Sequence, residues 1–293
     1  MPPGNQADRI EGYDQPRVRA MPSSPSFVSP PLEEVALAVQ FQPLAIDMLA
    51  AAEFSRSLPE EFSQREEQPS RPPMSEEFTV GAQLPFRFEF LAASPMPRLW
   101  FLTESGTRLI QLQADLIAYN WRRSPGGVPA DEDYPRYAKL RDELAKHLIA
   151  LGNVETRTGE SLKPNWCEVT YINHIGPTGD SEERPPLDEV LNGVAIPTDR
   201  FLPAPEDANA NVRFVIPGDD SPRGRLNVAL TPGFRLSDGV PIWVLTMTAR
   251  LLHQGEEGAV SVLNSLDTGH DWVVNGFVDM TSERMHELWG RTV

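Results

Sequence analysis

The chain has 293 residues, one cysteine (Cys167) and a formal net charge of −16, from 42 acidic and 26 basic side chains. A single cysteine excludes an intramolecular disulfide framework and a metal cluster made of cysteines alone, and it favours a reducing compartment. We therefore expect a cytoplasmic protein. The acidic charge disfavours nucleic-acid binding, and no apolar run reaches the length of a signal peptide or of a membrane span.

The first 31 residues contain seven prolines, few apolar side chains and mixed charge. Such a segment cannot bury enough surface to offset the entropy lost on ordering, so residues 1–31 are predicted to be a disordered tail. An α+β module is expected over residues 32–177. Its first half is predicted to contain a strand near 34–41, a helix over 44–56, a proline-rich stretch over 63–74 and a strand over 86–90.

The clearest local pattern is a β-hairpin. Residues 108–113 and 116–122 have the pattern of two strands around a two-residue turn. Such a turn sets the register, and hence which side chains share a face. The pairs on the apolar face are then Leu112 with Ile117 and Ile110 with Tyr119.

The other face of this hairpin is polar. Amides and a guanidinium in this number are costly to bury without hydrogen-bond partners. We therefore expect the face to meet water, a ligand or a partner protein, through Gln111, Gln113, Asn120 and Arg122.

A helix is predicted over residues 131–151, because leucines recur there at helical spacing and a glycine follows the last of them. The next predicted strand covers residues 166–175. Asn173 and His174 lie at its end, where side chains are well placed to meet a ligand, so we add them to the candidate binding residues.

An acidic, proline-rich connector is predicted over residues 178–209 and a second module over 210–293. The patterns in this module predict strands over 212–216, 225–231 and 241–252, a helix over 259–277 and a short helix over 282–289. Strands thus precede a helix in both modules. We predict an α+β fold of two βββα-like halves, with antiparallel sheet covered by long amphipathic helices, and the halves pairing edge to edge is one arrangement that fits.

None of the five histidines has the spacing of a zinc site, and no glycine-rich phosphate loop follows a strand, so no metal or cofactor is expected. His147 and His270 lie on apolar helix stripes, which favours hydrogen-bonded interior histidines over ligands. Near the C-terminus, Trp289 and its aromatic and methionine neighbours have the spacing of a core, although an exposed adhesive patch is the alternative.

His174 shares a strand face with Glu168, and a histidine oriented by a carboxylate can act as a general base. No Gly-x-Ser-x-Gly nucleophile motif is present, and Cys167 lies on the opposite face of the strand from His174. The sequence therefore does not identify a catalytic nucleophile.

Several phrases of the chain resemble an uncharacterised, sporadically distributed family of bacterial and archaeal proteins of similar length. The matching residues are 31–35, 109–113, 119–123, 134–137, 169–175 and 270–291. The resemblance brings no activity, cofactor or catalytic residue. A patchy distribution implies accessory genes, and defence against phage is one role that fits it.

We therefore hypothesise a non-enzymatic binding protein that receives a ligand or a protein partner on its polar hairpin face together with Asn173 and His174. The first alternative is a metal-independent hydrolase or transferase that uses His174 with Glu168. The second is a structural subunit of a complex or a homo-oligomer, which an exposed Trp289 patch would support.

Overall fold

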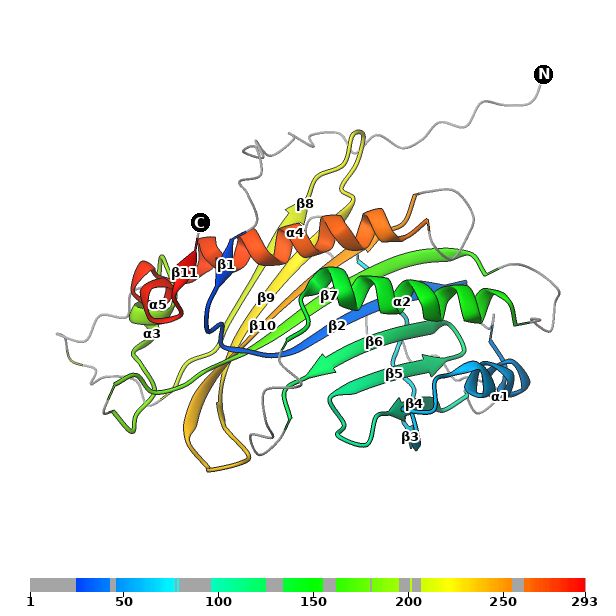
Figure 1. The fold of residues 1–293 in the computed structure, drawn as a ribbon. Helices are drawn as coiled ribbons and strands as arrows, with labels where there is room; N and C mark the ends of the chain where they lie inside the picture. The colour runs from blue at the N-terminus through cyan, green and yellow to red at the C-terminus, as the bar shows by residue number, and fades with distance from the viewer. Residues whose placement is uncertain are drawn as a thin grey trace, which may run out of the picture.

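A computed structural model describes residues 25–42, 46–76, 78, 96–124, 134–154, 162–179, 181–194, 201, 207–254 and 261–292. The strand predicted over 86–90 lies outside these residues. The described chain forms a mixed α/β fold around one large antiparallel sheet, with a small two-stranded sheet at its side (Figure 1). No helix in the described part is long and apolar enough to cross a membrane.

The large sheet has nine strands in the order β3-β4-β5-β6-β2-β7-β10-β9-β8, and each pair of neighbours is antiparallel. The strands are β2 (Leu32–Phe41), β3 (Gln64–Gln68), β4 (Arg98–Leu102), β5 (Arg108–Gln113), β6 (Leu116–Arg122), β7 (Pro164–Ile175), β8 (Ala210–Ile216), β9 (Gly224–Phe234) and β10 (Pro241–Leu252). The predicted hairpin is confirmed, because Leu112 pairs with Ile117 and Ile110 with Tyr119.

The helices are short. They are α1 (Met48–Ser57), α2 (Tyr137–Gly152), α3 (Leu187–Val190), α4 (Leu263–Met280) and α5 (Glu283–Leu288). The longest described helix, α4, has 18 residues, so the expectation of long helices is not confirmed. The helix expected to start at residue 131 begins instead at Tyr137, directly after the positive-φ residue Arg136.

Helices α2 and α4 lie side by side on one face of the sheet, which we call the covered face (Figure 1). Gly269 of α4 allows the close approach, because a Cβ there would lie 3.0 Å from side-chain atoms of both Val169 and Leu251. The alternation of β7 sends Val169 and Tyr171 toward these helices and Glu168 and Thr170 to the opposite face.

The strands continue through the middle of the chain without a break in the sheet. In the first half a β4-β5-β6 meander precedes α2, and in the second half a β8-β9-β10 meander precedes α4. The central strands β2 and β7 pair with each other, and one cluster of buried apolar side chains includes residues of both halves. The division into modules at residues 178–209 stays a prediction.

The prediction of a disordered tail is wrong for residues 25–31, because they form ordered chain that includes a strand. Strand β1 (Ser26–Phe27) pairs with β11 (Arg291–Thr292) in the small sheet. The Phe27 ring lies 5.6 Å from that of Phe277 and 6.1 Å from that of Trp289 between ring centroids. Large aromatic rings bury much apolar surface, so the packing of Phe27 holds this segment in place although most of the first 31 residues are not apolar. Residues 1–24 lie outside the described chain.

Candidate functional site

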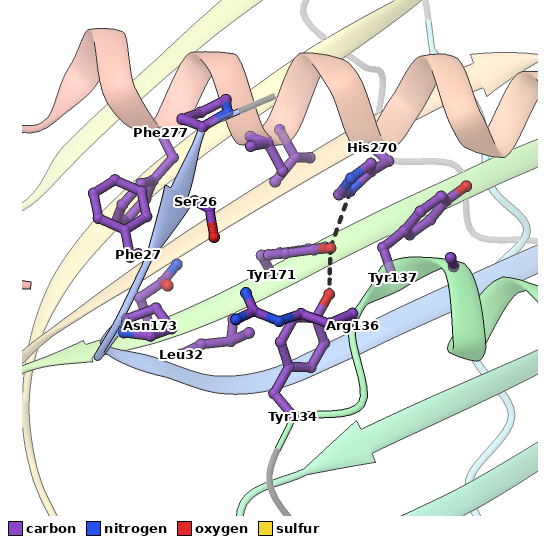
Figure 2. A pocket seen from close by; sticks show the side chains of 15 residues that line it. Ser26, Phe27, Leu32, Tyr134, Arg136, Tyr137, Tyr171, Asn173, His270 and Phe277 are labelled. Atoms are coloured by element: carbon purple, nitrogen blue, oxygen red, sulfur yellow. Dashed lines mark hydrogen bonds between the residues drawn. The ribbon is translucent and has the colours of Figure 1, made fainter. Parts of the chain in front are cut away.

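A cavity of about 350 Å³ lies on the covered face, between β7, α4 and the start of α2 (Figure 2). This volume is within the range of sites that bind small molecules. Strand β1 forms one side of the cavity, so the N-terminal segment belongs to its wall. The apolar part of the wall comes from Phe27, Leu32, Val273, Val274 and Phe277.

Two periodicities bring the polar lining together. Tyr171 and Asn173 are two residues apart on β7 and therefore point to the same face. His270 lies one helical turn before Val273 and Val274 on α4. Tyr134 comes from the residues that precede α2. These polar groups therefore come from three segments that are far apart in the sequence, and the N-terminal segment adds a fourth part of the wall.

A chain of hydrogen bonds crosses the cavity (Figure 2). The hydroxyl oxygens of Tyr134 and Tyr171 lie 2.8 Å apart, and the Tyr171 oxygen lies 3.0 Å from His270 Nδ1. Burial raises the pKa of Tyr134 to about 12, raises that of Tyr171 well above 10 and lowers that of His270 to about 4. All three groups are therefore neutral at pH 7, and the His270 tautomer sets the direction in which the chain donates.

The His270 ring is held in place by Tyr137. The two rings stack with centroids 3.8 Å apart and an interplanar angle of 1°. The Tyr137 hydroxyl donates a hydrogen bond of 2.8 Å to Asp267 Oδ1, and Arg141 pairs with the same carboxylate at 2.7 Å. Burial is the largest cause of the raised pKa of Tyr137, followed by its hydrogen bond to Asp267. Asp267 is thus already paired and does not enter the cavity lining.

Arg136 lines the same cavity in a strained backbone conformation. Its φ of 72° and ψ of 151° belong to a region that glycine adopts almost exclusively. Its side chain is exposed and makes no ion pair with any described residue. Figure 2 shows this side chain extending from the start of α2 past Tyr134 toward Leu32. The sequence reasoning missed Arg136, because a positive φ at a non-glycine residue leaves no compositional signal.

Asn173 and His174 are separated by the sheet. Asn173 lines the cavity on the covered face, where its Nδ2 donates to the Leu245 carbonyl oxygen at 3.3 Å. His174 points to the opposite face, with Nδ1 3.7 Å from Glu33 Oε2, and burial lowers its pKa. Neighbouring residues of a strand alternate in direction, so the two residues grouped from the sequence cannot line one site.

The polar hairpin face is largely closed, contrary to expectation. Gln111, Gln113 and Asn120 are 6%, 3% and 3% exposed. Gln111 Nε2 donates to Asn120 Oδ1 at 2.8 Å, and Asn120 Nδ2 donates to Glu34 Oε1 at 2.5 Å. These amides bond to one another and to the half-buried Glu34 carboxylate, whose pKa is raised mainly by burial. Gln111 Oε1 and Arg122 Nε are buried without a hydrogen-bond partner among the described residues. The Arg122 guanidinium lies 5.5 Å from the ring centroid of Trp100.

The chain itself covers much of the remaining face. Residues 71–76, which we call the crossing segment, run over the side of the sheet opposite α2 and α4. The Arg71 N–H donates to Gln113 Oε1 at 3.0 Å, and Gln113 Nε2 donates to the Arg71 carbonyl at 3.1 Å. Further along, Met74 exchanges two backbone hydrogen bonds with the side chain of Gln40. The prolines of this segment lack backbone N–H groups, so it forms few internal hydrogen bonds. Side chains of the strands bond to its backbone instead.

Glu168 and His174 are not brought together. They lie six residues apart on one strand, which separates their Cα atoms by about 20 Å. The buried Glu168 carboxylate instead accepts hydrogen bonds from Arg250 Nη2 at 2.6 Å and Nε at 3.0 Å. Cys167 is fully buried, and burial raises the pKa of its thiol to about 12. The predicted histidine–carboxylate pair is therefore wrong.

The remaining candidates are interior residues. His147 is 5% exposed and surrounded by the rings of Phe54, Phe62 and Tyr119, and burial lowers its pKa to about 4. Trp289 is 9% exposed and packs in the core, so an exposed Trp289 patch is ruled out. Among the described residues, no three histidine, cysteine, aspartate or glutamate side chains are placed to hold a metal ion.

Comparison with known proteins adds no relative. No protein-family model matches the chain, and no curated protein matches it. The cavity is therefore the feature of the molecule that bears on its function.

Proposed function

We propose that this is a non-enzymatic binding protein that holds a small, mainly apolar molecule in the cavity beneath β1. The observation that carries the proposal is the cavity itself: an apolar wall of Phe27, Val273 and Phe277 combined with a few convergent polar groups. Natural ligand sites have this composition, because apolar contacts supply affinity and a few polar contacts supply orientation.

The neutral state of the hydrogen-bonded chain from Tyr134 through Tyr171 to His270 supports binding rather than turnover. Tyr171 and His270 are hydrogen-bonded to each other, and their shifted pKa values keep both uncharged near neutral pH. A neutral hydrogen-bonding chain orients a ligand without creating a charged nucleophile. The enzymatic alternative has lost its histidine–carboxylate pair, so no observation favours it.

The compartment and the class of partner are proposed from the composition of the chain. The acidic charge and the single cysteine support a cytoplasmic protein without a nucleic-acid partner. The family resemblance supports an accessory role, with defence against phage as one form of it. The homo-oligomer and complex-subunit alternatives are left without the Trp289 patch that would have supported them.

Titration with N-phenyl-1-naphthylamine, a neutral probe that fluoresces in apolar surroundings, tests the binding function. We expect saturable, one-site binding that Val274→Phe weakens at least ten-fold by filling the cavity. Val278→Phe is the matched control, since Val278 lies one turn further along α4 and is also half-buried, but does not line the cavity. No saturable binding, or an equal loss in both variants, would refute the proposal.

A further inference from the structure

The cavity combines an apolar wall with a positive charge at its opening. Among the described residues, the lining includes Arg136 but no aspartate or glutamate. The Arg136 side chain is exposed and makes no ion pair with any described residue. The Asp267 carboxylate pairs with Arg141 and Tyr137 instead.

The backbone at Arg136 points to a role beyond folding. A non-glycine residue in this φ and ψ region is strained, and such strain concentrates at ligand sites. Glycine would adopt this conformation without strain, and Arg136 is exposed, so packing does not demand an arginine. What the arginine adds is a planar, permanently charged group that can bind a carboxylate through two parallel hydrogen bonds.

We propose that the ligand of this cavity is an organic acid, with an apolar body against Phe27, Val273 and Phe277 and a carboxylate held by Arg136. The inference depends on the proposed binding function and adds the chemical class of the ligand. The Tyr134 hydroxyl is the second donor, because the chain through Tyr171 to His270 can run so that Tyr134 donates outward. The acid group then sits at the opening and the apolar body inside.

The test compares two probes of nearly the same shape, 1-naphthaleneacetate and its neutral analogue 1-naphthaleneacetamide, by calorimetric titration of the full chain. We expect the acid to bind at least ten-fold more tightly than the amide. Arg136→Gln should remove this preference by weakening the binding of the acid at least ten-fold. Lys139→Gln is the matched control, because it removes one positive charge from the exposed first turn of α2, outside the lining, and should leave the preference intact.

The outcomes separate this inference from the function on which it rests. If both probes bind with equal affinity, or if Arg136→Gln weakens both equally, the acid class is wrong and the apolar site stands. If neither probe binds and N-phenyl-1-naphthylamine also fails, the binding function itself is wrong. Circular dichroism of Arg136→Gln checks that the variant is folded.

Discussion

The two faces of the sheet bury their side chains in different ways. On the covered face, apolar side chains of α2 and α4 pack against the strands and leave a cavity lined by the neutral groups Tyr134, Tyr171 and His270 and by the charged Arg136. On the opposite face, charged and amide side chains are buried against one another and against the crossing segment. Polar residues in a strand thus mark a ligand site only when the chain has not already paired them.

The opposite face also shows how a charge network can hold a loop in place. Glu76 pairs with Arg250 at 3.1 Å and with Arg225 at 3.5 Å, and Asn227 donates to the same carboxylate at 3.2 Å. The crossing segment is therefore fixed at both ends, by Gln113 near Arg71 and by this cluster at Glu76. On the covered face, by contrast, the exposed Arg136 guanidinium makes no ion pair with a described residue. The two faces therefore differ in whether their charged side chains are paired within the described chain.

The largest effect is expected from the apolar packing of the covered face. Leu148→Ala should lower the free energy of unfolding by about 2–5 kcal/mol, because it removes fully buried methyl groups and leaves a void. Ile149→Ala on the same helix is the control, since Ile149 is 50% exposed and should cost far less. Urea denaturation followed by circular dichroism measures both. Equal losses would mean that α2 does not pack as described.

A smaller effect is expected on the opposite face. Glu168→Ala should destabilise the protein by about 1.5–3 kcal/mol, because the charged hydrogen bonds from Arg250 are lost. Glu67→Ala, at an exposed position of β3, should change stability by less than about 0.5 kcal/mol. Chemical denaturation of the two variants side by side checks this. A neutral result for Glu168→Ala would show that the buried pair adds no net stability.

The buried histidines of the covered face predict a pH dependence. His147 has an ordinary pKa of 6.5 when unfolded and about 4 when folded, because burial disfavours its charged form. Its contribution is therefore complete above pH 6.5 and is lost as the pH falls toward 4, since the unfolded chain takes up the proton first. We expect a loss of about 2–3 kcal/mol across this window.

Unfolding curves between pH 7.5 and 4.5 measure this dependence, and His147→Leu should flatten it. A variant with the same slope as the wild type would show that other groups carry the pH response. His174, on the opposite face, serves as a second comparison through His174→Gln, because it is only half-buried and should contribute a shallower slope.

The smallest effect is a gain. Arg136→Gly should stabilise the protein by about 0.5–1 kcal/mol, because relief of backbone strain exceeds the greater entropy of glycine in the unfolded chain. The same variant should lose the preference for 1-naphthaleneacetate. Arg136→Ala separates the two effects, since it removes the guanidinium and keeps the strain. A destabilised Arg136→Gly would mean that the arginine side chain supports the fold.

Local patterns in the chain predicted seven strands of the large sheet, the hairpin register and the interior position of His147. They missed β4 and also β3, which lies inside the expected proline-rich stretch, and they did not place His270 in a ligand site. They also placed Asn173 among the site residues, although for a reason that applied equally to His174. Alternation along β7 could have separated these two residues, because adjacent strand positions point to opposite faces.

The sequence by itself determined most of the helices and long strands, since the periods of 2 and 3.6 residues and the turn between β5 and β6 are properties of neighbouring residues. Tertiary structure alone decided which polar groups are free. The crossing segment reaches Gln113 from 42 residues away, and the cavity needs Phe27, Tyr134 and His270 from three distant segments. Pairing at such separations depends on how the sheet is ordered, and local spacing holds no information about that order.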